Sequence, residues 1–454
     1  MFDTILIANR GEIARRVIRT LDRLGIGSVA VYTPADRRAP FVREAVHAVQ
    51  ISSYLDIDAV VAACAQWGAE ALHPGYGFLS ENPALARACA LAGVTFIGPP
   101  SEAGELMGDK LRAKEAAARA GVPVVPSFTE DEARTTGADA YPLLVKAAAG
   151  GGGRGIRVVQ NPESLDAALE AARREAKAGF GDDRVFIERF LPRARHLEVQ
   201  VIADAHGNVL HLGERECSLQ RRHQTVMEES PSPVVSAELR AALGEEAVAL
   251  ARAAGYVNAG TVEFIADFAH PAEHYFLEMN ARLQVEHPVT ELVTGLDLVE
   301  LQLRVAAGEL LPLAQDDVTL SGHAIEVRVT AEDAERDFLP AAGRVLAYAR
   351  PASTREVRVD DAIEPGSVID TNYDSLVAKV IAHGTDRPQA LARLDQALAG
   401  FTVLGVSTTT RYLRGLLAED AVRAGELDTG LIERRGVPAG PIGDEGIAIA
   451  AAML

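Results

Sequence analysis

The chain of 454 residues is long enough for about three domains of roughly 150 residues each, and its hydrophobic content of 48% can fill several cores. The formal net charge of −19 argues against a nucleic-acid partner, because nucleic-acid phosphates would be repelled. The 3 cysteines are too scattered for a disulfide framework or a metal-ligand motif, which favours a reducing compartment. The N-terminus lacks a signal-peptide pattern and no apolar run reaches the roughly 20 residues of a membrane helix, so we expect a cytoplasmic protein without a membrane partner.

Short buried strands alternate with helices in the first domain, which we expect over residues 1–109. A helix from Gly11 to about Leu24 follows the first strand, and Gly25 ends it. This βαβ series predicts a parallel sheet, whereas residues 9–12 lack the G-x-G-x-x-G spacing of a dinucleotide site. The expected strands are Thr4–Ala8, Ser28–Tyr32, Ala69–Leu72 and Val94–Ile97.

A glycine-rich segment defines the second region, residues 110–195. Four consecutive glycines, residues 150–153, lie between two short apolar strands, the first of which ends in Lys146. Glycines let backbone N–H groups approach phosphate oxygens closely, so we predict a phosphate-binding flap; a flexible linker is the alternative. The chain contains no G-x-x-x-x-G-K-[ST] motif, which argues against a Walker-type phosphate site.

Two carboxylates are predicted to face each other in the third region, residues 196–320. A strand over residues 260–266 carries Glu263, and the return strand from His274 carries Glu278, so an antiparallel pair brings the two acids together. Asn280 shares the face of Glu278 because side chains alternate along a strand. Like charges repel unless a cation lies between them, and carboxylate and amide oxygens suit Mg²⁺. A polar edge strand with a solvated loop is the alternative.

The segment after this strand is unusually polar. Arg282 is a planar, permanently charged group that suits a small planar oxyanion, and Glu286 lies near enough to take a proton. Pro288 is expected to end the extended run. Upstream, His196, Glu198 and Gln200 share one face of a strand, and for Glu198 and Gln200 a half-exposed strand is the alternative.

Residues 278–287, with the sequence E-M-N-A-R-L-Q-V-E-H, resemble the metal-and-bicarbonate segment of biotin carboxylases, a branch of the ATP-grasp enzymes. Residues 9–14, 73–82 and 372–379 resemble further segments of that family, so the resemblance covers about residues 1 to 435. It implies an α/β ATP-grasp fold with a Rossmann-like parallel-sheet domain (1–109), a mobile glycine-rich lid (110–195), an ATP-grasp core (196–320) and a C-terminal mixed-sheet domain (321–435). Residues 436–454 are expected to be a linker or tail.

The resemblance also implies a role for each matching residue. The metal ligands would be Glu263, Glu278 and Asn280. Bicarbonate would bind Arg282, Gln284 and the Val285 backbone. The catalytic residues would be Arg282, Glu286 as the general base, and Arg328, which would stabilise the biotin enolate. The nucleotide would contact Lys110, Lys146, Gly151, Gly152, Gly153, Glu188, Leu191, His196, Gln220 and His223.

The expected function is ATP- and bicarbonate-dependent carboxylation of biotin through carboxyphosphate, the first half-reaction of an acyl-CoA carboxylase in fatty acid metabolism. ATP and Mg²⁺ (or Mn²⁺) are the expected cofactors. No methionine precedes a lysine, so we expect biotin in trans on a biotin carboxyl carrier domain or protein. The other expected partners are a carboxyltransferase subunit, and either a second copy in a homodimer or the members of a larger carboxylase complex.

Thr225 departs from the family, which has a lysine that helps to hold bicarbonate at this position. Threonine supplies no charge, and Arg221 and Arg222 are the nearby candidates to replace it. Two alternatives remain: another ATP-grasp ligase that uses a different acyl phosphate, and a degenerate nucleotide-binding subunit with a scaffolding role.

Overall fold

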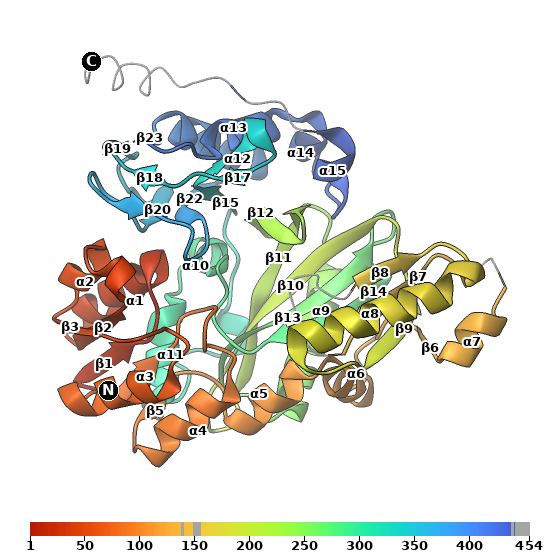
Figure 1. The fold of residues 1–454 in the computed structure, drawn as a ribbon, viewed down its shortest axis with the longest axis horizontal. Coiled ribbons are helices and arrows are strands. Elements are labelled where there is room, and N and C mark those ends of the chain that lie inside the picture. The colour runs from red at the N-terminus through yellow and green to blue at the C-terminus, as the bar shows by residue number, and fades with distance from the viewer. Residues whose placement is uncertain (138–139, 149–155, 437–439, 441–454) are drawn as a thin grey trace.

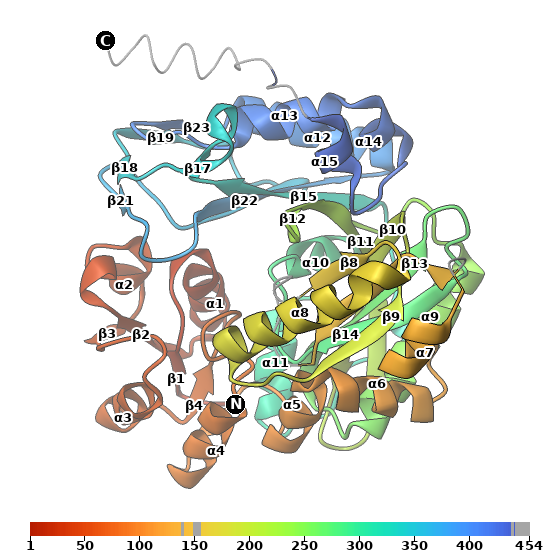
Figure 2. The same ribbon diagram turned by 45° about the vertical axis from the view of Figure 1, so that its right-hand side comes forward.

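The computed structural model describes residues 1–137, 140–148, 156–436 and 440. The predicted flap glycines Gly151, Gly152 and Gly153 and most of the expected tail lie outside these ranges. Figures 1 and 2 show the C-terminal elements (blue) above the N-terminal domain (red) and the lid (yellow). In the view of Figure 1, the central strands (green) lie between the N-terminal domain and the lid. None of the helices among the described residues combines the length and the apolar character that a membrane crossing requires.

The N-terminal domain has the parallel sheet that the sequence predicts. Its order is β3-β2-β1-β4-β5, and each neighbouring pair is parallel. Helix α1 starts at Gly11 and ends at Gly25, whose left-handed backbone closes it, as expected. The strands are β1 Thr4–Ile7, β2 Gly27–Tyr32, β3 His47–Gln50, β4 Ala71–His73 and β5 Thr95–Phe96, and the helices are α1 Gly11–Leu24, α2 Pro40–Glu44, α3 Ile57–Trp67, α4 Pro83–Leu91 and α5 Ser101–Gly108.

The lid is a small antiparallel sheet covered by one long helix. Its strand order is β6-β9-β7-β8, and a buried apolar cluster that includes Val145, Leu169 and Ile187 joins the sheet to helix α8. β7 and β8, the two strands expected on either side of the predicted flap, are antiparallel neighbours, and the flap itself stays a prediction. The elements are α6 Lys110–Arg119, β6 Ser127–Phe128, α7 Glu130–Thr135, β7 Leu143–Ala147, β8 Ile156–Val159, α8 Leu165–Phe180 and β9 Val185–Arg189.

An antiparallel sheet of eight strands, in the order β14-β13-β10-β11-β12-β15-β22-β20, forms the centre of the molecule. It crosses the domain boundary expected near residue 320, because β15 pairs with β12 on one side and β22 on the other. The region of residues 196–320 and the C-terminal region therefore share one sheet. Its strands are β10 Ala194–Ala203, β11 Val209–Arg221, β12 Gln224–Ser230, β13 Asn258–Asp267, β14 His274–Asn280, β15 His323–Thr330, β20 Val357–Asp361 and β22 Leu376–Gly384.

Helices and short strands complete the central and C-terminal regions. The extended run that contains Asn280 ends there, and Pro288 lies in the first turn of α10, where its fixed φ and missing N–H suit a helix start. The remaining helices are α9 Ala237–Ala253, α10 His287–Thr294, α11 Leu298–Ala306, α12 Arg387–Ala399, α13 Thr410–Ala418, α14 Asp420–Ala424 and α15 Leu431–Arg435. The short strands are β16 Glu332–Asp333, β17 Leu339–Pro340, β18 Gly343–Arg344, β19 Ala347–Ala349, β21 Val368–Ile369 and β23 Thr402–Leu404.

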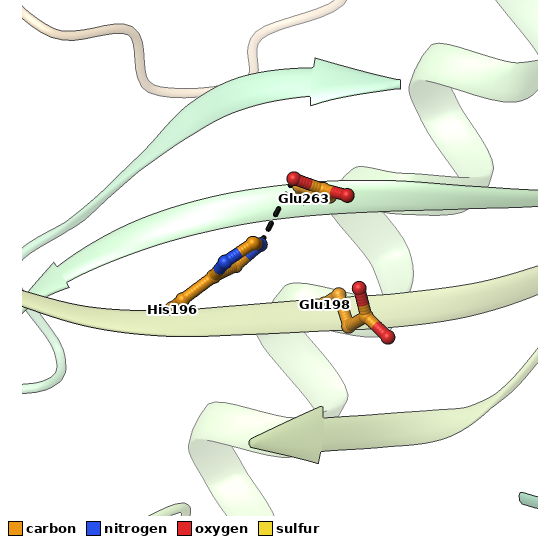
Figure 3. Close-up of side chains that lie close together, drawn as sticks. All are labelled: His196, Glu198 and Glu263. Atoms are coloured by element: carbon orange, nitrogen blue, oxygen red, sulfur yellow. Dashed lines mark ion pairs between the residues drawn. The ribbon is translucent and has the colours of Figure 1, made fainter. Parts of the chain in front are cut away.

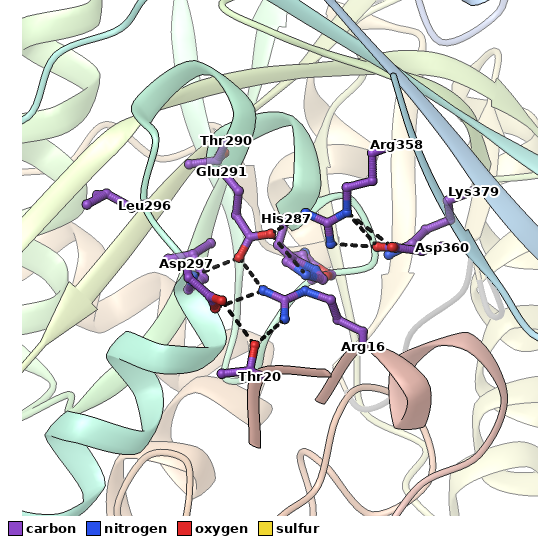
Figure 4. Close-up of polar contacts among 12 residues, drawn as sticks. Arg16, Thr20, His287, Thr290, Glu291, Leu296, Asp297, Arg358, Asp360 and Lys379 are labelled. Carbon is purple, nitrogen blue, oxygen red and sulfur yellow. Dashed lines mark hydrogen bonds and ion pairs between the residues drawn. The ribbon is translucent and has the colours of Figure 1, made fainter. Parts of the chain in front are cut away.

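A buried ionic network joins the N-terminal domain to the central sheet (Figure 4). Glu291 on α10 accepts from Arg16 on α1 at 2.8 Å and from Arg358 on β20 at 2.7 Å. Arg16 also contacts Asp297, and Arg358 also pairs with Asp360. One buried carboxylate thus ties together three elements that are far apart in the sequence.

Glu291→Gln is expected to lower the free energy of unfolding by about 3 kcal/mol, because it leaves the buried Arg16 and the half-buried Arg358 with one anionic partner fewer. Denaturant unfolding measures the change. Glu433→Gln on the exposed side of α15 is the control. A loss for Glu291→Gln no larger than for the control would show that the network does not hold the domains together.

Candidate active site

Three carboxylates and one guanidinium form a row across four neighbouring strands. In the register of the sheet, Glu278 on β14 lies opposite Glu263 on β13, as predicted. Glu263 also lies opposite Glu198 on β10, which in turn lies opposite Arg215 on β11. Glu198 and Arg215 are fully buried, so the half-exposed alternative for Glu198 is wrong.

Two basic side chains lie against the carboxylate row. His196 Nε2 lies 2.9 Å from Glu263 Oε2 (Figure 3), and Lys110 Nζ lies 3.2 Å from Glu278 Oε2. Burial alone would lower the pKa of His196, but the Glu263 carboxylate raises it to about 9. Burial raises the pKa of Glu198 to about 7 even though Arg215 opposes the shift. Two side-chain cations, His196 and Lys110, therefore lie against the carboxylates of the row.

The donor set at this row fits a hard divalent cation. Glu263, Glu278 and Asn280 come together on β13 and β14, and all three offer oxygen atoms. The Asn280 amide donates to Glu263, so the two side chains are in direct contact. His196 and Lys110 now lie against carboxylates whose negative charge a bound Mg²⁺ would neutralise. The negative charge of the row thus favours a bound cation.

Arg282 is held in place by partners on three sides. Its guanidinium donates to Asn280 Oδ1 at 3.1 Å and to Gln284 Oε1, and its Nε lies 3.3 Å from Glu81 Oε2. Gln284 Nε2 donates to Glu263 Oε1 at 3.2 Å. The predicted bicarbonate residues are therefore bonded directly to the predicted metal ligands.

Glu286 is a buried carboxylate next to Arg328. Arg328 NH2 donates to Glu286 Oε2 at 3.0 Å, and its Nε donates to Glu228 at 2.5 Å. Burial by itself raises the pKa of Glu286. The positive charges of Arg328 and Arg215 outweigh this effect, so the pKa of Glu286 lies below its ordinary value. Glu286 is thus an ionised base at neutral pH.

A cavity of about 450 Å³ opens beside these groups. Arg282, Arg328 and Thr225 line it together with Tyr76 from the N-terminal domain. Arg221 also lines the cavity and pairs with Glu332 at 2.6 Å, whereas Arg222 is exposed and pairs with Asp337. Of the two candidates to replace the missing lysine, only Arg221 reaches the cavity.

The N-terminal wall of this cavity depends on a tight loop. Asn9 Nδ2 donates to the carbonyls of Pro74 and Tyr76, both at 2.7 Å. Gly75 has a φ of +63°, and an added Cβ would lie 2.8 Å from the Asn9 amide nitrogen, so only glycine fits. The family-like loop at residues 73–82 therefore presents Tyr76 to the cavity and Glu81 to Arg282.

The predicted nucleotide residues are only partly brought together. In the lid, Lys146 Nζ lies 3.2 Å from Glu188, which also pairs with Lys114 of α6. Gln220 lies 2.7 Å from His196, next to the carboxylate row. Leu191 is buried after β9. His223 is exposed at the tip of the β11–β12 hairpin, away from this group, and its nucleotide role stays a prediction.

Sequence reasoning missed several groups at the site. The sequence marks Glu198 only as part of an alternating strand, and no pattern singles out the site residues Arg215, Lys114 and Glu228. The alternation of residues 196–200 marks the face, but the register between β10 and β13 depends on tertiary pairing. The sequence therefore carries a signal for Glu198, and for Glu81 through the family-like segment 73–82.

The fold and the site are those of an ATP-grasp protein: a small antiparallel sheet with its covering helix beside a central antiparallel sheet that carries a row of acidic side chains. Family models agree along the chain. "Biotin carboxylase, N-terminal domain" matches residues 1–103, "Carbamoyl-phosphate synthase L chain, ATP binding domain" matches 109–314, and "Biotin carboxylase C-terminal domain" matches 326–434.

Two curated relatives illustrate the range of similar proteins. The alpha chain of the mitochondrial methylcrotonoyl-CoA carboxylase of Oryza sativa subsp. japonica is 48% identical over 95% of this chain and 60% of its own length. A pyruvate carboxylase component of Methanothermobacter thermautotrophicus is 46% identical over 97% of this chain and 91% of its own. The chain belongs to the biotin carboxylase family. It spans about 60% of the length of the plant relative.

Solved structures give the same result. The biotin carboxylase domain dimer of the Hydrogenobacter thermophilus 2-oxoglutarate carboxylase, in complex with MgADP, ADP and bicarbonate, is 43% identical and covers 96% of this chain and 98% of its own, with a TM-score of 0.91. The Campylobacter jejuni biotin carboxylase, in complex with β,γ-ATP, is 41% identical over 96% and 99% of the two chains, with a TM-score of 0.92. The expected ATP-grasp fold is confirmed.

Proposed function

We propose that the chain uses ATP and bicarbonate to carboxylate biotin carried on another domain or protein, the first half-reaction of a biotin-dependent carboxylase. The observation that carries this proposal is a chain of contacts: Arg282 lines the cavity and contacts Gln284, which donates to Glu263 in the carboxylate row. Arg328 lines the same cavity and donates to the base Glu286. The relatives differ in the acceptor that their names give, so the proposal covers only the half-reaction.

Each group has a defined part in this chemistry. Arg282, Gln284 and the Val285 backbone bind bicarbonate, and Glu286 removes its proton as its oxygen attacks the γ-phosphorus of ATP. ADP leaves and carboxyphosphate forms. Its C–O bond then breaks to give CO₂ and phosphate, and the phosphate takes the proton from the ureido nitrogen of biotin. Arg328 stabilises the resulting enolate, whose nitrogen attacks CO₂.

The remaining predicted residues serve the nucleotide. Lys110 and Lys146 neutralise phosphate charge, and the proposal also assigns Gly151, Gly152 and Gly153, which lie outside the described residues, to the nucleotide. Glu188, Leu191, His196, Gln220 and His223 position the nucleotide. Mg²⁺ or Mn²⁺ held by Glu263, Glu278 and Asn280 would supply charge neutralisation for the phosphates.

We also propose the assembly and location that this activity needs. Biotin arrives on a biotin carboxyl carrier domain or protein, and carboxybiotin then moves to a carboxyltransferase subunit. The dimeric biotin carboxylase domain among the similar structures supports a homodimer. The cytoplasm is the proposed compartment.

Initial rates of ADP release, measured with and without bicarbonate and free biotin, test this function. We expect ADP release to require bicarbonate and to rise when biotin is added. ATP turnover that ignores bicarbonate would favour another ATP-grasp ligase, and nucleotide binding without turnover would favour a scaffolding role.

Arg328→Ala is expected to lower biotin carboxylation by roughly 100-fold, because the enolate loses its cation. Bicarbonate-dependent ATP hydrolysis should fall less, by roughly 10-fold, through the lost contact with Glu286. Parallel assays of carboxybiotin and ADP give the two values. Equal losses in both assays would contradict the placement of Arg328 at biotin.

Thr225→Lys is expected to raise kcat/KM for bicarbonate by roughly 10-fold, because it adds a cation to the wall of the cavity that holds Arg282. Thr225→Met, which adds length without charge, is the matched control. Steady-state kinetics with varied bicarbonate make the comparison. If the lysine and methionine variants behave alike, charge at this position does not matter.

A further inference from the structure

Lys379 is a fully buried lysine on β22 with no role in the function proposed above. Its Nζ donates to the backbone carbonyl of Val285 at 2.6 Å and lies 3.1 Å from Glu12 Oε1. Figure 4 shows it beside Asp360, the residue opposite it on β20. A buried ammonium is costly unless its partners are fixed, so these contacts define a specific arrangement.

The carbonyl that Lys379 contacts belongs to the peptide bond between Val285 and Glu286. The N–H of the same peptide unit is the backbone N–H of Glu286, the residue whose carboxylate accepts from Arg328. A peptide unit is planar and rigid, so a hydrogen bond to its carbonyl also fixes the direction in which the Glu286 backbone leaves it. Lys379 therefore positions the backbone of Glu286 through one peptide plane.

A second cation holds the other end of Glu286. Arg328 lies directly opposite Lys379 in the β15–β22 register, and it donates to the Glu286 side chain at 3.0 Å. Two neighbouring cations of the sheet thus fix one residue, Lys379 through the backbone and Arg328 through the carboxylate. This leaves the Glu286 carboxylate little freedom to turn away from Arg328, which lines the cavity.

Lys379 also links this loop to the N-terminal domain. Glu12, in the first turn of α1, accepts a hydrogen bond from Tyr76, which lines the cavity, and pairs with Lys379. Glu12 is buried, with an exposure of 3%. The cavity wall and the loop that carries the base are therefore joined through a single ammonium group.

We propose that Lys379 is a positioning residue: it fixes the Val285–Glu286 peptide, and so the carboxylate that takes the proton of bicarbonate, against the wall formed by Glu12 and Tyr76. This inference rests on the proposed function, because it assigns Glu286 its role as the base. It adds a residue of the C-terminal region to the bicarbonate site.

Lys379→Met removes the ammonium and keeps most of the side-chain volume. We expect kcat/KM for bicarbonate to fall by roughly 10- to 100-fold, the typical effect of a misplaced catalytic group, with the KM for ATP unchanged. Lys379→Arg, which keeps the charge and can donate to the carbonyl, should recover most of the loss. Lys379→Gln, whose amide can still meet Glu12, replaces the methionine variant if that variant does not fold.

Arg387→Met is the control for loss of a buried cation. Arg387 pairs with the buried Glu229 and donates to the carbonyls of Val422 and Arg423, so its described contacts lie away from the Val285–Glu286 loop. The variant should lower thermal stability and leave the bicarbonate kinetics near those of the unaltered protein. If Lys379→Met changes every kinetic parameter to the same extent, or no more than Arg387→Met does, the inference is wrong.

Hydrogen exchange of the Glu286 amide, measured without substrates, separates this inference from the proposed function. We expect faster exchange in Lys379→Met than in the unaltered protein and the control variant. If the unaltered protein shows no bicarbonate-dependent ADP release but the Glu286 amide still exchanges faster in Lys379→Met, the proposed function is rejected. The positioning contact of Lys379 is then retained. Unchanged exchange would overturn the inference even in an active enzyme.

Discussion

Replacing Glu286 by glutamine is expected to lower kcat for bicarbonate-dependent ADP release by roughly 10²- to 10⁴-fold, the range typical of a lost general base. The amide keeps the shape of the side chain and can still contact Arg328, but it accepts no proton. The KM for ATP should stay unchanged, because the lysines proposed to contact the phosphates, Lys110 and Lys146, pair with Glu278 and Glu188 instead of Glu286. Initial rates of ADP release at saturating ATP give the value.

Glu246→Gln is a matched control for this variant, because Glu246 pairs with His274 outside the carboxylate row. The pH profile adds a second measure. Arg328 and Arg215 hold the pKa of Glu286 below its ordinary value, so the base is ionised at neutral pH and activity is lost only as acid protonates it. Arg328→Met should therefore move the acid limb of kcat/KM to higher pH. A Glu286→Gln variant as active as the control would contradict the assignment of the base.

Replacing Glu278 by glutamine is expected to raise the Mg²⁺ concentration for half-maximal activity by roughly 10- to 100-fold. The substitution removes one of the two carboxylates that lie opposite each other on β13 and β14, and it also removes the ion pair with Lys110. A titration of ADP release against Mg²⁺ at fixed ATP measures the shift.

Glu273→Gln is the control for this experiment, since Glu273 lies in the turn before β14 and pairs with the lid residue Arg189 instead of joining the row. It should leave the Mg²⁺ dependence unchanged. If Glu278→Gln and Glu273→Gln give the same titration curve, Glu278 is not a metal ligand in this protein.

The sequence predicted local features well where one strand or helix determines them. The parallel N-terminal sheet follows from its βαβ pattern, and the pairing of Glu263 with Glu278 follows from one hairpin. The end of α1 at Gly25 follows from the left-handed backbone that glycine adopts easily. These features depend on residues that are close in the chain.

Features that depend on distant segments could not be predicted. Glu198 joins the acidic row because β10 lies between β13 and β11, an order that the alternation of one strand does not reveal. The contact of Lys379 with Val285 spans 94 residues, and that of Glu81 with Arg282 about 200. Only the assembled sheet brings these groups together.

The central claim is that ATP phosphorylates bicarbonate in this site. Bicarbonate labelled with ¹⁸O tests it directly, with mass spectrometry of the phosphate released during turnover. Since a bicarbonate oxygen attacks the γ-phosphorus and stays on phosphorus when CO₂ departs, each phosphate should carry one labelled oxygen. Phosphate that carries no label, while ADP is still released, would mean that water attacks ATP and would contradict the account.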